Sequence, residues 1–129
     1  MTVRHHRLLV IDDEPMLGQT LRFAFEEQYE VVVLGRGMDA LELLSRDTKF
    51  DLILCDLMMP TFSGMKVYEV LAERQPELLN RFVFITGGAF TDSARSFLDA
   101  YGGPRLEKPF HVADVEALLQ GSTDPPGAK

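Results

Sequence analysis

The sequence predicts an α/β fold: a parallel sheet with helices on both of its faces. Five short apolar runs alternate with longer segments in which apolar residues recur at helical spacing. Parallel strands need crossover connections, so this alternation indicates a parallel sheet. Three of the runs are apolar almost throughout, which is typical of strands covered by helices on both sides.

The first half of the chain predicts two strands and two helices. The strands are expected at 7–11 and 30–34, where branched aliphatic residues dominate. Pro15 suits a first helical turn, so one helix is expected over 15–28, and a second over 38–46. The residues expected to face inward from these helices are Leu17, Leu21, Ala24, Phe25, Ala40, Leu41 and Leu44.

The second half predicts three more strands, each followed by a helix. Proline and glycine mark the loop 58–64, and Pro104 beside the last strand indicates a sheet edge, where a missing N–H does least harm. The strands are expected at 51–55, 81–85 and 105–107. The first of the three helices is expected to end near residue 74, with Val67, Val70 and Leu71 inward. The other two are expected over 92–100 and 112–120.

The composition is that of a globular protein, with 46% hydrophobic and 26% charged residues. We expect one domain over 7–120, an N-terminal extension at 1–6 and a flexible tail or linker stub at 121–129. No apolar run approaches the roughly 20 residues that cross a membrane, and no signal-peptide pattern is present. The single cysteine fits a reducing compartment, so a cytoplasmic location is expected, without membrane contact.

The formal net charge is −7, and the thirteen Lys and Arg residues are scattered. A nucleic-acid surface needs a basic patch that replaces the counterions of the phosphates, so direct nucleic-acid binding is not expected. A metal cation or a basic partner surface suits this charge better.

Polar residues follow four of the predicted strands at the point where each ends. Ligands of open parallel sheets bind beyond these carboxyl ends, so the following residues are expected to converge on one rim: Asp12, Asp13, Asp56, Thr86 and Lys108. Carboxylates favour Mg²⁺, and a carboxylate beside the ion can attack phosphorus. Lysine, a hydroxyl and loop amides can hold the transferred phosphoryl oxygens, so the set fits phosphoryl transfer.

These residues resemble the receiver domain of two-component response regulators. The resemblance rests on Asp12-Asp13, the stretch from Asp56 to Pro60 with Gly64, Thr86 and Lys108-Pro109, and it covers about 6–120. It implies a (βα)5 doubly wound, flavodoxin-like fold with strand order 2-1-3-4-5. The LEKPF ending and the GG pair after Thr86 are similar to receivers of hybrid histidine kinases as much as to free-standing regulators.

The resemblance implies a role for each residue of the rim. Asp56 is expected to accept a phosphoryl group from a histidine of a sensor kinase or phosphotransfer protein. Mg²⁺ is expected on Asp13, on Asp56 and on the Met58 carbonyl, with Asp12 acting through water. Lys108 is expected to pair with Asp56 and later to hold the phosphoryl group, together with Thr86 and the loop residues Met58 and Gly87. A cis peptide bond is expected before Pro109.

Two positions depart from the family pattern. An aromatic residue often stands three before the lysine, where this chain has Arg105. The chain thus has no aromatic residue at that position to couple with Thr86, and Arg105 is a candidate for part of a charged output surface. Met58 and Gly88 stand where polar side chains often position the hydrolytic water. We therefore expect slow self-dephosphorylation of a signalling switch rather than the turnover of an enzyme.

Two surfaces are candidates for partners. A second stripe of the first helix, Met16, Thr20 and Phe23, is either core or the docking face for the kinase. The output partner is expected on the face formed by 92–100, 105–107 and 112–120. Two other functions stay open: a phosphate-independent interaction module of the same fold, and a Mg²⁺-dependent aspartyl phosphatase, although Met58 cannot serve as the second acid that such phosphatases use.

Overall fold

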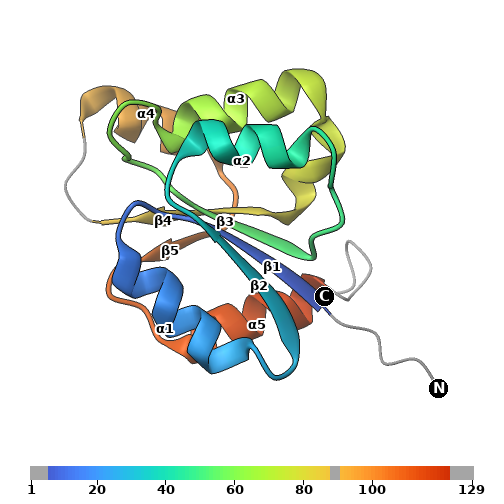
Figure 1. Ribbon diagram of the computed structural model, residues 1–129. Coiled ribbons are helices and arrows are strands. Elements are labelled where there is room, and N and C mark those ends of the chain that lie inside the picture. The colour runs from blue at the N-terminus through green and yellow to red at the C-terminus, as the bar shows by residue number, and fades with distance from the viewer. Residues whose placement is uncertain (1–5, 88–90, 123–129) are drawn as a thin grey trace.

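A computed structural model describes residues 6–87 and 91–122 (Figure 1). The strands are β1 (His6–Ile11), β2 (Tyr29–Leu34), β3 (Leu52–Asp56), β4 (Phe82–Thr86) and β5 (Arg105–Glu107). The helices are α1 (Pro15–Phe25), α2 (Gly37–Leu44), α3 (Gly64–Arg74), the 3-10 helix η1 (Pro76–Arg81), α4 (Asp92–Tyr101) and α5 (Val112–Ser122). Most of the expected extension (1–6) and tail (121–129) lies outside the described residues, as does Gly88.

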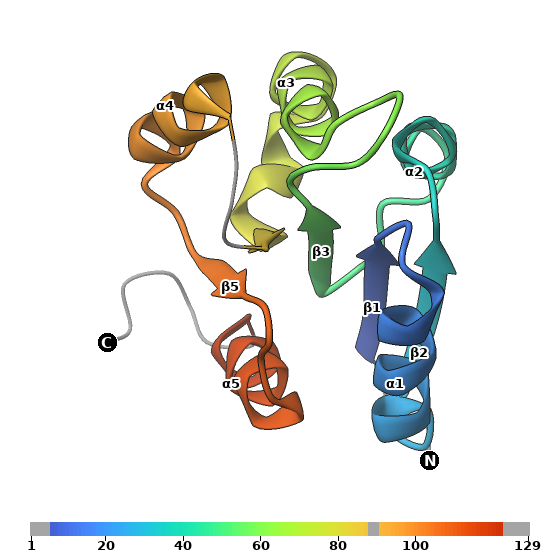
Figure 2. The same ribbon diagram turned by 90° about the vertical axis from the view of Figure 1, so that its left-hand side faces the viewer.

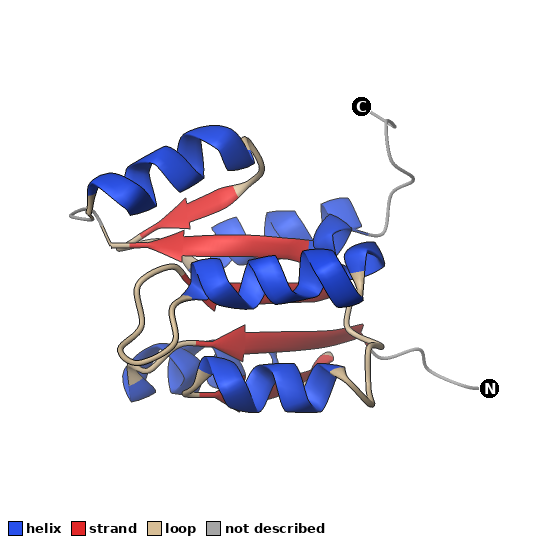
Figure 3. Ribbon diagram, turned by 90° about the horizontal axis from the view of Figure 1, so that it is seen from above, coloured by secondary structure: helices blue, strands red, loops and turns tan. Residues whose placement is uncertain are grey.

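The strands form one parallel sheet in the order β2-β1-β3-β4-β5, which confirms the predicted topology. The short β5 pairs with β4 alone among the described strands, so it is the edge strand that Pro104 indicated. Helices α1 and α5 cover one face of the sheet, and α2, α3 and α4 cover the other (Figure 2). Seen from above, all strands point the same way, so their carboxyl ends share one edge (Figure 3).

Helices on both faces explain why the last four residues of β1 are all apolar. Leu8, Leu9, Val10 and Ile11 are all fully buried. Leu8 and Val10 belong to the core under α1 and α5, whereas Leu9 and Ile11 belong to the core under α2, α3 and α4. Alternate side chains of a strand point to opposite faces, so each position in the buried part of this interior strand needs an apolar residue.

An aromatic cluster holds α4 against the sheet. Its rings, each within contact distance of at least two others, are Tyr68, Phe82, Phe84, Phe97 and Tyr101. The hydroxyl of Tyr101 lies 3.1 Å from the Phe82 carbonyl oxygen and 2.9 Å from that of Pro104. It therefore joins the end of α4 to β4 and to the start of β5.

The structure differs from the sequence predictions at several helix and strand ends and on one face of α1. Helix α1 ends at Phe25 rather than near residue 28, and Ala24 is exposed instead of inward. Gly18 is buried instead, and it lies so close to β2 that a Cβ there would be 2.4 Å from Cγ1 of Val33. The 3-10 helix η1 was not predicted; it begins at Pro76 and delays β4 by one residue. No described helix has the length and apolar character of a membrane span.

Candidate functional site

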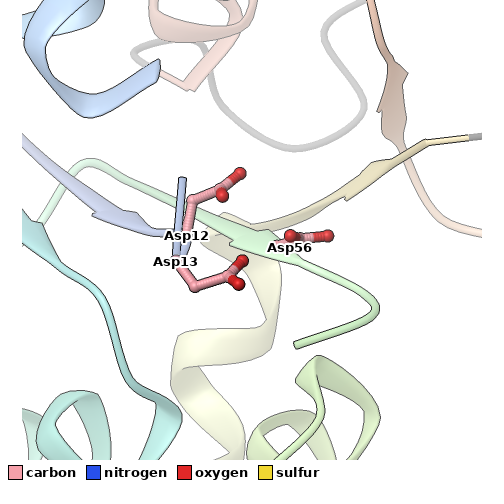
Figure 4. Close-up of side chains that lie close together, drawn as sticks. All are labelled: Asp12, Asp13 and Asp56. Carbon is pink, nitrogen blue, oxygen red and sulfur yellow. The ribbon is translucent and has the colours of Figure 1, made fainter. Parts of the chain in front are cut away.

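Three carboxylates gather where β1 and β3 end. One oxygen from each of Asp12, Asp13 and Asp56 can be chosen so that all three lie within 4.8 Å of one another (Figure 4). The strands β1 and β3 are neighbours in register, with Ile11 opposite Cys55, so the residues that follow them emerge side by side. Asp12 is 2% exposed and Asp56 7%, whereas Asp13 is open to solvent. The structure therefore brings together the acidic residues that the sequence placed on one rim.

Asp12 is held by backbone contacts on both sides. Its amide continues the ladder by donating to the Leu34 carbonyl at 3.0 Å, and its Oδ1 accepts from the amide of Glu14 at 2.8 Å. Its other oxygen, Oδ2, is buried and accepts no hydrogen bond from the described residues, although Lys108 Nζ lies 3.1 Å away. A buried carboxylate oxygen with unused acceptor capacity is suited to a cation or a water held by one.

Asp56 carries a carboxyl group whose ionisation is unfavourable in this setting. Burial, followed by the negative charge of Asp12, raises its pKa to about 6. Lys108 and the amide of Met58, which donates to Oδ1 at 3.2 Å, act in the opposite direction. The cluster thus has more negative charge than its surroundings neutralise.

Lys108 reaches three carboxylates at once. Its Nζ lies 3.1 Å from Asp12 Oδ2, 3.4 Å from Glu14 Oε1 and 3.8 Å from Asp56 Oδ2. Burial alone would lower the pKa of the ammonium, but these carboxylates outweigh it and raise the pKa. The expected pairing with Asp56 is therefore the longest of three contacts.

Backbone contacts fix the positions of Lys108 and Thr86 relative to each other. The amide of Lys108 donates to the Thr86 carbonyl at 2.8 Å, and the peptide bond between Lys108 and Pro109 is cis. Thr86 is the last residue of β4 and is 2% exposed. Gly87 follows it in the open, where an added Cβ would meet no described atom within 4 Å.

The loop after β3 returns tightly to the phosphoacceptor candidate. Gly64 begins α3, and its amide donates to the Leu57 carbonyl at 2.9 Å. A Cβ at Gly64 would lie 2.2 Å from the backbone carbonyl oxygen of Asp56, a distance no side chain tolerates. Glycine is therefore required here by close packing. Met58, in the same loop, has 40% of its surface exposed.

The second stripe of α1 is not core. Met16 is 67% exposed and Phe23 85%, and Thr20 is exposed as well, so the alternative that these residues are buried is wrong. A groove of about 390 Å³ lies between α1 and the segment after β5. Its lining residues are Glu14, Met16, Leu17, Thr20, Lys108, Pro109 and Phe110.

Arg105 lies exposed on the edge strand, opposite Phe84 of β4 in the register of the sheet. It lines a second groove, of about 560 Å³, together with residues of α5 such as Asp114 and Leu118. Glu14 is a further partner of Lys108 that the sequence pattern does not identify. Glu14 is the third of three consecutive acids in the sequence, but Lys108, its partner, lies 94 residues further along the chain.

Comparison with protein families matches residues 8–120 to the response regulator receiver domain. The transcriptional regulatory protein BtsR of Escherichia coli K12 is 30% identical over 115 residues, which are 88% of this chain and 46% of that protein. The DNA-binding response regulator MtrA of Mycolicibacterium smegmatis is 31% identical over 131 residues, 98% of this chain and 56% of that protein. The chain spans about half the length of these relatives.

Solved structures share the fold at lower sequence identity. A response regulator receiver domain protein from Clostridium thermocellum superposes with a TM-score of 0.77 at 24% identity, over 91% of this chain and 93% of that one. The chemotaxis protein CheY4 of Vibrio cholerae gives 0.75 at 21% identity, over 92% and 99% of the two chains. Both likenesses confirm the fold.

Proposed function

Because this chain belongs to the response regulator receiver domain family, we propose that it is a phosphorylatable switch whose phosphoacceptor is Asp56. The observation that carries the proposal is the position of this carboxylate: buried at the end of β3, beside two further aspartates and one lysine. An interaction module without phosphorylation has no use for three carboxylates and an ammonium at one strand edge.

The transfer needs a nucleophile and a phosphohistidine donor. A carboxylate oxygen of Asp56 attacks the phosphorus, forming a P–O bond as the P–N bond to the donor imidazole breaks. The electron pair of the broken bond stays on the imidazole nitrogen, and the product is an acyl phosphate. Charge on the phosphoryl oxygens must be neutralised for this step, and Lys108, 3.8 Å from Asp56 Oδ2, can supply one positive charge.

The acidic cluster fits Mg²⁺, because its donors are hard carboxylate oxygens and one of them, Asp12 Oδ2, accepts no hydrogen bond from the described residues. We assign direct binding to Asp13, to Asp56 and to the Met58 carbonyl, and binding through water to Asp12. When bound, the ion would neutralise charge on the carboxylates and on the phosphoryl oxygens. The attachment of these residues to the ends of β1 and β3 would fix the position of the ion.

Phosphorylation would add charge at the rim and change the balance of two conformations. Thr86 would turn toward the phosphoryl group, and the face formed by α4, β5 and α5, with Arg105 at its edge, would change its affinity for an output partner. The exposed stripe of Met16, Thr20 and Phe23 would receive the histidine kinase or phosphotransfer protein. Met58, which has no polar group to position water, supports a slowly hydrolysed acyl phosphate.

Acetyl phosphate with Mg²⁺ tests the proposal without a kinase. The expected result is one phosphoryl adduct, base-labile and detected by intact mass, that Asp56→Asn abolishes and the exposed control Asp99→Asn retains. Absence of an adduct would support the phosphate-independent module. Turnover of many phosphoesters, with release of inorganic phosphate, would support the phosphatase.

A further inference from the structure

Glu14 stands at the start of α1 without capping it. It occupies the N-cap position with an extended backbone (φ −90°, ψ 111°), and its side chain makes no capping hydrogen bond within the described helix. Its Oε1 lies instead 3.4 Å from Lys108 Nζ. Glutamate is a poor N-cap compared with the shorter Asp, Ser or Thr, so its carboxylate loses little by turning to the lysine.

The turn that presents Glu14 is built by the acidic cluster itself. The amide of Glu14 donates to Asp12 Oδ1 at 2.8 Å, which sets the direction in which the chain leaves β1. The Glu14 side chain is 55% exposed and that of Lys108 27%, so the pair lies at the outer margin of the site. Glu14 does not belong to the group of aspartates whose oxygens converge for a cation.

The three partners of Lys108 compete for one ammonium. Its contacts to Asp12 and Glu14 are shorter, at 3.1 and 3.4 Å, than the 3.8 Å to the phosphoacceptor. A phosphoryl group on Asp56 would offer further acceptor oxygens to the same ammonium, and contact with them would compete with the contact to Glu14. Any attraction to Glu14 therefore opposes the approach of Lys108 to the phosphoryl oxygens.

We infer that Glu14 is a positioning residue for Lys108: its carboxylate holds the ammonium at the margin of the site and so limits the rate at which Asp56 is phosphorylated. The inference rests on the proposed function of Asp56. Glu14 touches no reacting atom and acts through the lysine. An exposed ion pair of this kind is worth less than about 1 kcal/mol, so its removal is expected to change the rate by about 2- to 5-fold.

The test compares Glu14→Gln with the wild-type chain at saturating Mg²⁺, with acetyl phosphate as donor. Glu14→Gln keeps the size of the side chain and removes its charge, and it is expected to be phosphorylated about 2- to 5-fold faster. It is also expected to bind beryllofluoride, a mimic of the phosphoryl group, more tightly by a similar factor. Glu107→Gln is the matched control, since Glu107 is an exposed neighbour of Lys108 in sequence but not one of its three carboxylate partners.

Salt separates an ion pair from a structural effect. Raising ionic strength from about 0.05 M to about 0.5 M screens the exposed pair, so the wild-type rate should approach that of Glu14→Gln. Glu14→Asp, which shortens the side chain and keeps its charge, is expected to give a smaller gain and serves if Glu14→Gln does not fold. An unchanged rate in Glu14→Gln, an equal gain in Glu107→Gln, or a gain that salt does not reduce would overturn the inference. Loss of the wild-type adduct would instead refute the proposed function.

Discussion

Lys108 Nζ lies 3.1 Å from Asp12 Oδ2 but 3.8 Å from Asp56 Oδ2. The lysine is thus held nearer to Asp12 than to Asp56, the proposed phosphoacceptor. Negative charge at Asp56 is incompletely neutralised in this arrangement, which agrees with the raised pKa of its carboxyl group.

Replacing Asp56 by Asn is expected to stabilise the fold near neutral pH when divalent cations are removed. The pKa of about 6 in the folded state lies above the ordinary aspartate pKa of 3.8, so ionisation of Asp56 destabilises the folded state. Protonated Asp56 carries no such cost, so the free energy of unfolding falls as the pH rises from about 4 to about 6. After allowance for solvent screening, Asp56→Asn should gain about 1–2 kcal/mol at pH 7.

Urea denaturation at several pH values in EDTA measures this gain. The difference between Asp56→Asn and the wild type should be small near pH 4 and full by about pH 7. The same experiment on the exposed Asp99→Asn should show no such growth. A variant gain that is independent of pH would contradict the assignment of the effect to ionisation of Asp56.

Removing one carboxylate of the cluster is expected to weaken Mg²⁺ binding. Asp13 is exposed and lies at the solvent side of the cluster, so Asp13→Asn should fold normally while lowering the affinity by about 10-fold. Isothermal titration with MgCl₂ gives the affinity directly, without any phosphoryl donor. Equal affinity in the wild type and in Asp13→Asn would place the ion elsewhere.

Gly64→Ala is expected to destabilise the fold and disturb the loop after β3. The new Cβ would lie 2.2 Å from the Asp56 carbonyl oxygen, so the backbone must shift, at a cost of about 1–3 kcal/mol. Gly87→Ala is the matched control for stability, because its Cβ would meet no described atom within 4 Å. Denaturation midpoints compare the two, and similar midpoints would show that the approach at Gly64 is not tight.

Polar replacement of Met16 and Phe23 in the α1 stripe is expected to slow phosphorylation by a kinase without slowing phosphorylation by acetyl phosphate. Met16→Ser with Phe23→Ser should leave the rate with acetyl phosphate and the thermal midpoint unchanged, since both side chains are largely exposed. Transfer from a phosphorylated kinase that is active on the wild-type chain should fall about 10-fold or more, as expected for apolar anchors of an interface. The control Met38→Ser removes an exposed apolar residue from α2, on the opposite face. A parallel loss with acetyl phosphate would indicate a structural role.

The sequence was a good guide to the elements and to the rim. Apolar periodicity is a local property of each segment, and the five predicted strands all exist. Parallel strands of one sheet end at one edge, so the residues that follow them converge whatever the details of packing. The inward face of α1 was predicted less well, because Gly18 is buried and Ala24 is exposed. The close approach of Val33 to Gly18 depends on how β2 packs against the helix, and helical spacing does not predict it.

The sequence by itself determined the parallel α/β fold and the gathering of Asp12, Asp13 and Asp56 on one edge of the sheet. Tertiary structure alone decided which carboxylates hold Lys108 and that the second stripe of α1 faces solvent. The alternation of strands and helices follows from patterns within short segments, and the residues that end the strands follow from it. The distance from Lys108 to each carboxylate depends instead on how segments far apart in the chain pack together, to within an ångström.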